Sequence, residues 1–424
     1  MEGRARSRNE AVWSDIWMRE WAQRFVKRLD DPSMERLVMV AILLFAVAAR
    51  VAFALLFPDQ SAALPDSAEY RMAAHELASG HLIANDYVMP GYPLLVALTG
   101  PGIGRLAADI ALSVLSVWCV ERIVRAVTGN AFDSLVAAAI WAVYPFSLFY
   151  AVVGLTETLY AALVLLGFLA YYRSAFLLGS VALTAAILTR PSIEMLTPIL
   201  ILAFALVVHR TGWKRALRHL GAFVIVYVVM MAPWWWHNEV KYGQFVRLNL
   251  GSGIVLYSGN NPMNVTGGGI AGVDLDRKAF ANIADPVERD RAMRDSAIEY
   301  IVDHPRRFVE LAWLKLWRLW RPWPYAAQYA QPVLVVVSAA TILPLMLFAL
   351  IGLALWLKRW WRPLVPIVLF IGFITAVHMV TIGSVRYRFP MEPFLVILAA
   401  PAVAAGIRRL LGLDGGSRAQ PLPS

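Results

Sequence analysis

A short polar stretch between two apolar segments holds the first residues that could do chemistry. Residues 64–80 include Asp66 and Glu69, which are three residues apart and would share one face of a helix. Pro65 at its start and Gly80 at its end delimit that helix. Asp66 is well placed to cap the helix. Its carboxylate could equally act as a general base on a substrate hydroxyl, and one residue can do both.

Further ionisable residues lie at the ends of apolar segments, where each needs a partner or a purpose. These residues are Glu157, Arg190, Glu194, Arg386 and Arg388. Helix capping or an ion pair between Glu157 and an arginine would explain them without any function. Carboxylates can also activate an acceptor hydroxyl, and arginines can hold a phosphate through two hydrogen bonds. The pattern therefore indicates either a transfer reaction on a phosphorylated membrane lipid or the transport of an anion. For Arg50, deeper in an apolar segment, structural pairing and function are equally open.

The composition excludes a soluble enzyme. Of the 424 residues, 59% are hydrophobic and 16% are charged, whereas soluble proteins are about 25% charged. The net charge of +10 does not indicate a nucleic-acid partner, because Lys and Arg in membrane proteins mark cytoplasmic loops. One cysteine, Cys119, excludes an internal disulfide framework and a cysteine-based zinc site.

The apolar segments predict an all-α polytopic membrane protein with about ten transmembrane helices. The candidate spans are 37–57, 103–121, 133–152, 156–172, 175–189, 191–208, 219–236, 333–357, 363–382 and 391–407. Alternate loops between them are rich in Lys and Arg, which places both termini in the cytoplasm. Asp66, Glu157, Arg190 and Arg386 then all lie on the extracytoplasmic side.

This topology divides the chain into five parts. They are a cytoplasmic amphipathic segment 1–36, a transmembrane module 37–236 with a first outer loop 58–102, an extracytoplasmic region 237–332, C-terminal transmembrane helices 333–408, and a cytoplasmic tail 409–424. In the first part, Trp13, Trp17, Trp21, Phe25 and Leu29 recur at every fourth position. That stripe predicts a helix on the membrane surface, or alternatively a partner-binding helix. In the third part, residues 286–302 and 306–318 are predicted helices, and Gly267–269 a flexible break.

An ordered series of short motifs resembles the GT-C glycosyltransferases over residues 37–408. The nearest relatives are the bacterial members similar to protein O-mannosyltransferases and lipid A aminoarabinose transferases (GT39/GT83-like). The motifs are Pro65-Asp66-Ser67-Ala68-Glu69-Tyr70 with Leu77-Ala78-Ser79-Gly80, Pro90-Gly91-Tyr92-Pro93-Leu94, Thr156-Glu157-Thr158-Leu159, Thr189-Arg190-Pro191, Pro233-Trp234, His237-Asn238, Gly259-Asn260-Asn261-Pro262 and Arg386-Tyr387-Arg388. The resemblance implies a GT-C-like fold with extracytoplasmic juxtamembrane helices, in the bacterial inner membrane, with a periplasmic active site.

The resemblance also implies an activity and site residues. Family members transfer a sugar, with inversion, from a polyprenyl-phosphate donor to a lipid, glycan or protein acceptor. Asp66 matches the family's catalytic base and Glu157 a second acidic position. Arg190, Arg386 and Arg388 would neutralise the leaving lipid phosphate. The other implied substrate-binding residues are Glu69, Tyr70, Tyr92, His237, Asn260 and Asn261.

Three further expectations complete the interpretation. No cofactor is expected, because no compact metal-ligand spacing appears and the closer resemblance is to members that need no metal; a divalent ion remains an alternative. The chain lacks the soluble C-terminal domain of many larger members, so acceptor recognition would come from residues 58–102 and 237–332. The competing hypotheses are a transporter or flippase of lipid-linked glycans and a non-catalytic GT-C-like subunit.

Overall fold

The computed structural model describes residues 23–412 apart from 25, 30, 59–63, 277 and 325–330. Within these residues the regular structure is helical, and the one β-type contact is an isolated bridge between Ala271 and Leu275. The predicted all-α class is confirmed. Trp13, Trp17, Trp21 and Phe25 of the predicted amphipathic stripe lie outside the described residues, so the surface helix remains a prediction.

Five of the described helical segments are long and apolar enough to cross a membrane. They are α2 (Pro32–Leu56), α5 (Ile103–Thr128), α11 (Trp213–Tyr242), α15 (Pro332–Val380) and the segment Val385–Leu410, which comprises α16 (Val385–Arg388), η4 (Phe389–Met391) and α17 (Glu392–Leu410). Shorter apolar helices are α6 (Ala131–Val143), α8 (Thr156–Tyr172), α9 (Phe176–Thr189) and Thr197–Val208, which comprises α10 (Thr197–Leu202) and η2 (Ala203–Val208). Each of the ten predicted spans overlaps one of these helical segments.

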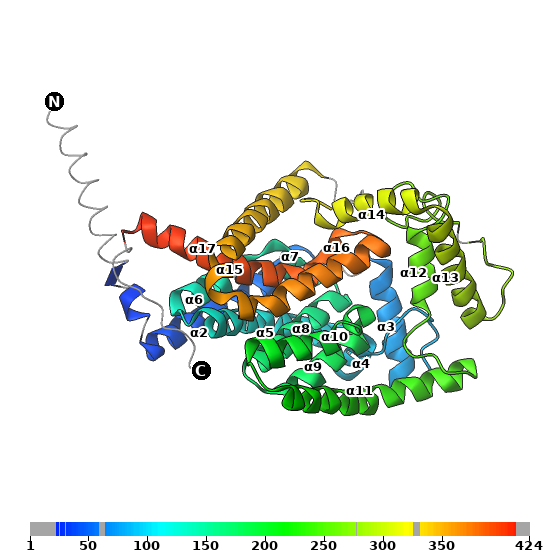
Figure 1. The fold of residues 1–424 in the computed structure, drawn as a ribbon, viewed down its shortest axis with the longest axis horizontal. Helices are drawn as coiled ribbons and strands as arrows, with labels where there is room; N and C mark the ends of the chain where they lie inside the picture. The colour runs from blue at the N-terminus through cyan, green and yellow to red at the C-terminus, as the bar shows by residue number, and fades with distance from the viewer. Residues whose placement is uncertain are drawn as a thin grey trace.

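Helix α15 contains two of the predicted spans. Its 49 residues would extend about 74 Å as a straight helix, more than twice the thickness of the hydrocarbon core. The backbone leaves the helical region at Trp360 (φ −125°, ψ 30°), inside the basic stretch 358–362. The two halves run in different directions on either side of that kink (Figure 1). The predicted count of ten crossings stays a prediction. Helix α6, for example, has 13 residues, fewer than the roughly 17–25 that a membrane-spanning helix needs.

The predicted span 133–152 is interrupted at a proline. Helix α6 ends at Val143, Tyr144 takes an extended backbone (φ −64°, ψ 120°), and α7 (Pro145–Tyr150) begins next. A residue before proline is pushed out of the helical region by the proline ring. The break leaves backbone carbonyls of α6 without helical partners inside the bundle.

Arg50 of α2 satisfies groups at this break. Its buried guanidinium donates to the carbonyl of Ala142 (3.1 Å) and to the hydroxyl of Ser147 (2.7 Å). It also donates to Ser113 of α5 (2.7 Å) and to the carbonyl of Ala46 (3.0 Å). Irregular backbone at membrane depth needs such internal partners. Arg50 therefore has a structural role, joining α2, α5, α6 and α7.

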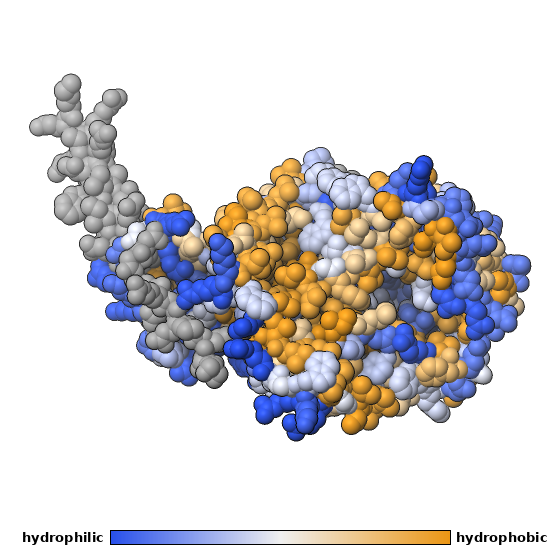
Figure 2. All heavy atoms as spheres, in the orientation of Figure 1, coloured by the Kyte–Doolittle hydropathy of each residue, from blue (hydrophilic) through white to orange (hydrophobic). Residues whose placement is uncertain are grey.

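Helix α17 packs inside the bundle. Most of its residues are buried, and Phe394 packs against Phe168 of α8 (ring centroids 4.7 Å apart) and Phe370 of α15 (4.8 Å). By contrast, α2, α11 and α15 carry many exposed large apolar side chains. Figure 2 shows apolar side chains mainly over the middle of the molecule and hydrophilic ones gathered towards its two ends. This distribution fits a bundle whose middle faces lipid.

The two ends of the bundle differ. The start of α2 and the end of α17 lie at one end, and α12 (Gly251–Gly259) and α13 (Pro286–Asp303) lie at the other (Figure 1). The Gln23 amide donates to the carbonyl of Leu411 (3.4 Å) at the first end. Helices α13 and α14 (Pro305–Trp320) confirm the predicted helices 286–302 and 306–318. Helix α11 continues to Tyr242, six residues past the predicted boundary at 236.

The glycine segment 267–269 is not the flexible break that we predicted. The carboxylate of Asp274 accepts hydrogen bonds from the backbone N–H groups of Val265 (3.0 Å), Thr266 (2.9 Å) and Ile270 (3.0 Å), and from the Thr266 hydroxyl. These bonds lower the pKa of Asp274, although burial opposes them. One carboxylate therefore fixes the loop on both sides of the glycines.

Candidate active site

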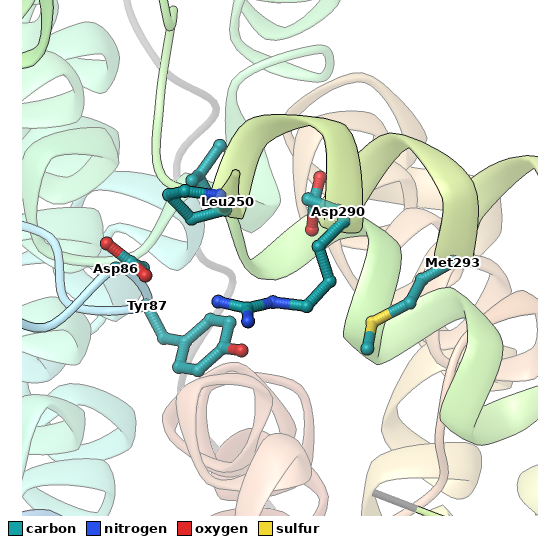
Figure 3. Close-up of a pocket in the computed structure, with 7 residues that line it drawn as sticks. Asp86, Tyr87, Leu250, Asp290 and Met293 are labelled. Atoms are coloured by element: carbon teal, nitrogen blue, oxygen red, sulfur yellow. The ribbon is translucent and has the colours of Figure 1, made fainter. Parts of the chain in front are cut away.

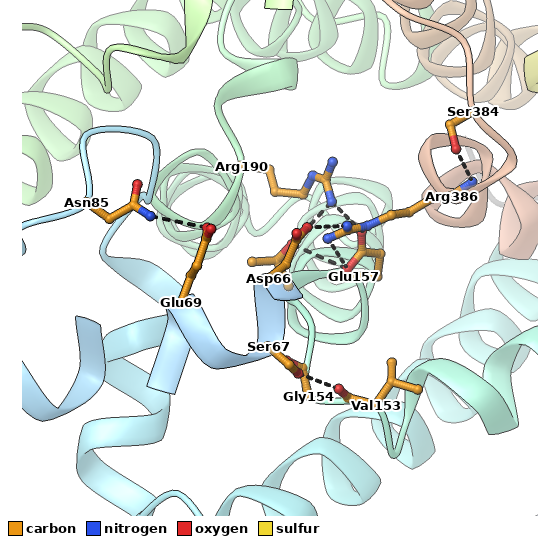
Figure 4. Close-up of polar contacts among 11 residues, drawn as sticks. Asp66, Ser67, Glu69, Asn85, Val153, Gly154, Glu157, Arg190, Ser384 and Arg386 are labelled. Carbon is orange, nitrogen blue, oxygen red and sulfur yellow. Dashed lines mark hydrogen bonds and ion pairs between the residues drawn. The ribbon is translucent and has the colours of Figure 1, made fainter. Parts of the chain in front are cut away.

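Four charged side chains from four helical elements form one alternating chain. Arg386 lies between Asp66 and Glu157, and Arg190 lies on the far side of Glu157 (Figure 4). Arg386 donates through Nη1 to Asp66 Oδ2 and through Nε to Glu157 Oε1. Arg190 Nη1 donates to the same Glu157 oxygen (2.6 Å) and to the Thr156 hydroxyl (3.2 Å). Two carboxylates and two guanidinium groups give the cluster a formal charge near zero.

Both carboxylates lie in the first turn of a helix, Asp66 in α3 (Pro65–Ala78) and Glu157 in α8. The positive end of a helix dipole stabilises a carboxylate there. The prediction that Asp66 caps its helix is wrong. The capping residue is Leu64, which makes no side-chain cap, and the Asp66 carboxylate binds Arg386 instead.

A proline directs Arg190 towards Glu157. Pro191 follows it, so Arg190 takes an extended backbone (φ −147°, ψ 121°) and ends α9. Helix α4 (Gly91–Thr99) approaches closely here, since a Cβ on Gly91 would lie 2.6 Å from Thr189 Oγ1. Residues of the predicted motifs 90–94 and 189–191 therefore lie together.

Arg386 stands at the start of the four-residue helix α16. The Ser384 hydroxyl caps this helix by accepting from the Arg386 backbone N–H (3.3 Å). The next residue, Tyr387, lies under Arg190, whose guanidinium carbon is 5.3 Å from the ring centroid. The His378 ring also stacks against Tyr387, with centroids 4.5 Å apart and 3° between the planes.

Sequence reasoning missed Tyr387 and His378 as neighbours of the site. Tyr387 lies between two arginines that we had singled out, so its position offered a signal. His378 lies in an apolar segment and stacks on Tyr387, so its sequence neighbours gave no signal.

The four charged groups differ in exposure. The Glu157 side chain is fully buried, whereas 44% of the Asp66 side chain is exposed. Within the described part of the chain, Arg190 hydrogen-bonds only through Nη1, and its side chain is 20% exposed. The cluster therefore offers an entering molecule a carboxylate oxygen of Asp66 and further N–H groups of Arg190.

Tyr70 borders this cluster from α3. Its ring meets the ring of Tyr92 edge-on at 5.5 Å. Burial raises the pKa of the Tyr70 phenol, while the charge of Arg386 acts in the opposite direction. The Tyr92 hydroxyl turns away from the cluster and donates to Asp109 (2.8 Å). Glu69 is exposed and accepts from the Asn85 amide (3.1 Å), away from Arg386 (Figure 4).

The structure does not bring Arg388 to the cluster. Its guanidinium is buried, pairs with Glu392 (2.8 Å), and donates to the carbonyls of Leu319 (3.2 Å) and Arg321 (2.7 Å). Glu194 is also separate: it accepts from the Tyr227 hydroxyl and pairs with Arg247. Arg388 joins α16 to the end of α14, and Glu194 joins the turn after α9 to α11 and to Arg247.

His237, Asn260 and Asn261 make internal hydrogen bonds as well. His237 Nε2 accepts from the Ile83 N–H (2.9 Å), and its Nδ1 lies 3.1 Å from the Asn238 side-chain oxygen. Asn260 donates to the Val380 carbonyl (2.8 Å) and accepts from the buried amine of Lys315 (2.8 Å). Asn261 donates to the carbonyls of Tyr257 (2.7 Å) and Asp274 (2.8 Å). Their predicted contacts with substrate remain predictions.

A separate small hollow lies between the first outer loop and α13. Asp86, Tyr87, Leu250, Asp290 and Met293 border it (Figure 3). It includes none of the four residues of the charged cluster. Among the described residues, no group of three or more His, Cys, Asp or Glu side chains is arranged to hold a metal ion.

Comparison with known proteins gives matches in structure but not in sequence. No protein-family profile and no curated protein match this chain. ArnT from Cupriavidus metallidurans, solved with undecaprenyl phosphate, superimposes with a TM-score of 0.51 at 17% identity. The oligosaccharyltransferase AglB from Archaeoglobus fulgidus, solved with an inhibitory peptide and a dolichol-phosphate, superimposes with a TM-score of 0.55 at 12% identity. A second structure of the Archaeoglobus fulgidus oligosaccharyltransferase, tethered to an acceptor peptide, gives 0.54 at 12%.

The chain has the GT-C fold. ArnT and AglB are both GT-C membrane glycosyltransferases, and the matches cover 85% and 91% of this chain. The fold that the ordered motifs predicted is thereby confirmed. The matched regions are 60% of the ArnT chain and 52% of the AglB chain, so this chain spans just over half the length of these proteins.

Proposed function

We propose that this protein is an inverting glycosyltransferase that moves a sugar from a polyprenyl-phosphate donor to an acceptor hydroxyl. The observation that carries the proposal is the half-exposed carboxylate of Asp66, held by Arg386 beside a second arginine. A general base must be reachable by its substrate, and a leaving phosphate needs nearby positive charge. The charged cluster supplies both an accessible carboxylate and two neighbouring guanidinium groups.

The proposed reaction is a single displacement. The acceptor oxygen attacks the anomeric carbon and forms the new glycosidic bond, while the bond from that carbon to the phosphate oxygen breaks. The acceptor proton passes to Asp66. The donor phosphodiester, with one negative charge, becomes a phosphomonoester with up to two. Asp66 uses Oδ2 for Arg386, which leaves Oδ1 to accept the proton.

Arg190 and Arg386 would stabilise the charge that grows on the leaving phosphate. A guanidinium already fixed by a carboxylate and an aromatic ring is preorganised for that task. Glu157 is buried and pairs with both arginines, so its proposed role is to orient them. The undecaprenyl phosphate and dolichol-phosphate in ArnT and AglB support a lipid-phosphate donor here.

The proposal places the reaction at the extracytoplasmic face of the bacterial inner membrane, with both termini in the cytoplasm. The Lys and Arg bias of the short loops supports this orientation. The lipid, glycan or protein acceptor would reach Asp66 from the side of α3 and α12–α14. No metal ion takes part in the proposed chemistry.

A panel of donors tests the proposal. Purified protein is incubated with polyprenyl-phosphate pentoses, hexoses and uronic acids plus a membrane-lipid extract, and products are analysed by mass spectrometry. We expect one donor to yield a glycosylated acceptor of inverted anomeric configuration. Transbilayer movement of a labelled lipid-linked sugar in sealed vesicles, without any new glycosidic bond, would instead establish a flippase.

A further inference from the structure

The turn that precedes Glu157 is bound by the residue next to Asp66. Ser67 of α3 is buried, and its hydroxyl lies 2.6 Å from the Val153 carbonyl and 2.7 Å from the Gly154 carbonyl (Figure 4). A single hydroxyl proton is therefore shared between two successive carbonyl groups. Glu157 follows three residues after Gly154, in the first turn of α8.

Arg105 of α5 binds the same turn from another side. Its Nη1 and Nη2 groups both donate to the Val152 carbonyl (3.4 Å each), and Nη1 also pairs with Asp109 (2.8 Å). Asp109 is fully buried and accepts from the Tyr92 hydroxyl of α4 (2.8 Å). Arg105 thus binds the carbonyl of residue 152, and Ser67 binds the next two carbonyls, at residues 153 and 154.

Gly154 makes this arrangement possible. Its φ of +70° lies in the left-handed region that favours glycine. A Cβ at this position would lie 2.9 Å from both Ser67 Oγ and Arg105 Nη1. The turn therefore admits both donors only because residue 154 has no side chain.

These contacts close a ring beside the charged cluster. Tyr70 and Ser67 of α3 connect through Tyr92 and Asp109 to Arg105, and from Arg105 through the turn back to Ser67. Asp66 lies at one side of the ring and Glu157 at the other, joined by Arg386. The hydrogen bonds of the ring join buried groups, whereas Asp66 itself is half-exposed.

We propose that Ser67 and Arg105 are positioning residues that fix α3 to the turn before α8 and thereby set Asp66 against the Arg386–Glu157 pair. The idea rests on the proposed function only in calling Asp66 the base. A catalytic group must be held within roughly 0.5 Å of its productive position. The half-exposed Asp66 side chain is restrained by Arg386 on one side, so the position of its backbone has to supply the remaining restraint.

Kinetics of Ser67 variants test the proposal. We expect Ser67→Ala to lower kcat at least tenfold while the KM for the lipid donor stays within twofold, because Arg190 is unchanged. Ser67→Thr keeps a hydroxyl and should restore most of kcat. The matched control is Ser79→Ala, at an exposed serine directly after the same helix, which should behave as wild type. Wild-type kcat in Ser67→Ala would overturn the proposal.

A double-mutant comparison separates positioning from a general loss of structure. If Ser67 acts through Asp66, the variant Asp66→Asn/Ser67→Ala should be no slower than Asp66→Asn alone. If the fold-loss in rate of the double variant equals the product of the two single fold-losses, Ser67 acts independently of Asp66, and the proposal is overturned. Arg105→Gln is the second test of the same ring and should repeat the Ser67→Ala pattern.

An experiment without turnover keeps this idea distinct from the proposed function. In the variant Asp66→Cys/Arg386→Cys, a short homobifunctional maleimide joins the two thiols, and Cys119 is buried and does not compete. Adding Ser67→Ala should lower the cross-linking rate at least threefold, whereas adding Ser79→Ala should not. An unchanged rate would contradict positioning even if transfer is observed. A lowered cross-linking rate, together with no sugar transfer by the wild-type protein in the donor panel, would support the positioning role of Ser67 and reject the proposed function.

Discussion

Arg386 hydrogen-bonds Asp66 across 320 residues of sequence and on its other side hydrogen-bonds Glu157. The residue that would take the acceptor proton and the residue that would stabilise the leaving phosphate are thus in direct contact. Arrival of the donor phosphate would draw positive charge away from Asp66 at the time when that carboxylate must accept a proton. In the proposed reaction, donor binding and base activation would therefore be coupled through one guanidinium.

Replacing Arg386 by lysine should separate these two roles. A lysine ammonium cannot reproduce the fork of N–H groups that reaches both carboxylates. We expect Arg386→Lys to lower kcat/KM by about 100-fold, equivalent to about 2.7 kcal/mol. Steady-state transfer rates measure this loss. The control is Arg294→Lys, at a half-exposed arginine of α13, and equal rates in both variants would contradict the proposed role.

Glu157→Gln should destabilise the fold as well as abolish transfer. The substitution leaves Arg190 and Arg386 side by side without their shared, fully buried counter-ion. Removing one member of a buried ion pair costs about 3–5 kcal/mol. We expect a clear drop in Tm in detergent, measured by tryptophan fluorescence. Glu310→Gln removes an exposed carboxylate of α14 and should leave Tm unchanged; equal effects of the two variants would show that the pair adds no stability.

Tyr387 should affect donor binding through Arg190. The ring lies 5.3 Å below the guanidinium, and cation–π contacts are worth about 0.5–2 kcal/mol. Tyr387→Leu should therefore raise the donor KM about 3- to 30-fold, while Tyr387→Phe keeps the aromatic face and stays near wild type. Initial rates over a donor titration provide the comparison. A Phe variant as weak as the Leu variant would assign the effect to the hydroxyl instead.

Lys315 should make stability depend on pH. It is fully buried in α14, and burial lowers its pKa to about 7 from an ordinary value of 10.5. Between these values the unfolded chain binds more protons than the folded one, so stability must rise with pH across that window. The slope reaches at most about 1.4 kcal/mol per pH unit. Tm measured from pH 6 to pH 10 should rise for wild type relative to Lys315→Met, and parallel curves would contradict a neutral buried amine.

The sequence predicted the apolar helices well because composition and length decide them. It also predicted α13 and α14, whose ends are marked by Pro286 and Pro305. It missed the interruption at Tyr144 because Pro145 stands inside an otherwise continuous apolar segment. The two predicted spans 333–357 and 363–382 form one helix, α15, but the kink at Trp360 separates them. The basic residues around the kink cannot be buried in lipid.

The charged cluster was predicted in part. Asp66, Glu157, Arg190 and Arg386 come together, but Arg388 does not. Two residues that are two positions apart on a helix point about 200° away from each other, so Arg386 and Arg388 cannot both face one site from α16. That spacing was visible in the sequence. The bond between His237 and the Ile83 backbone was not, because its partner is a main-chain group 154 residues away.

The central claim, that Asp66 is the base of a sugar transfer supported by two arginines, is tested most directly by one comparison. Wild type, Asp66→Asn and the exposed control Asp295→Asn are assayed with the donor identified from the panel, and lipid-phosphate binding is measured on the same preparations. We predict that Asp66→Asn lowers transfer at least 1000-fold, about 4 kcal/mol, with donor affinity within threefold of wild type and Asp295→Asn unaffected. Transfer by Asp66→Asn at a rate close to that of wild type would contradict the account.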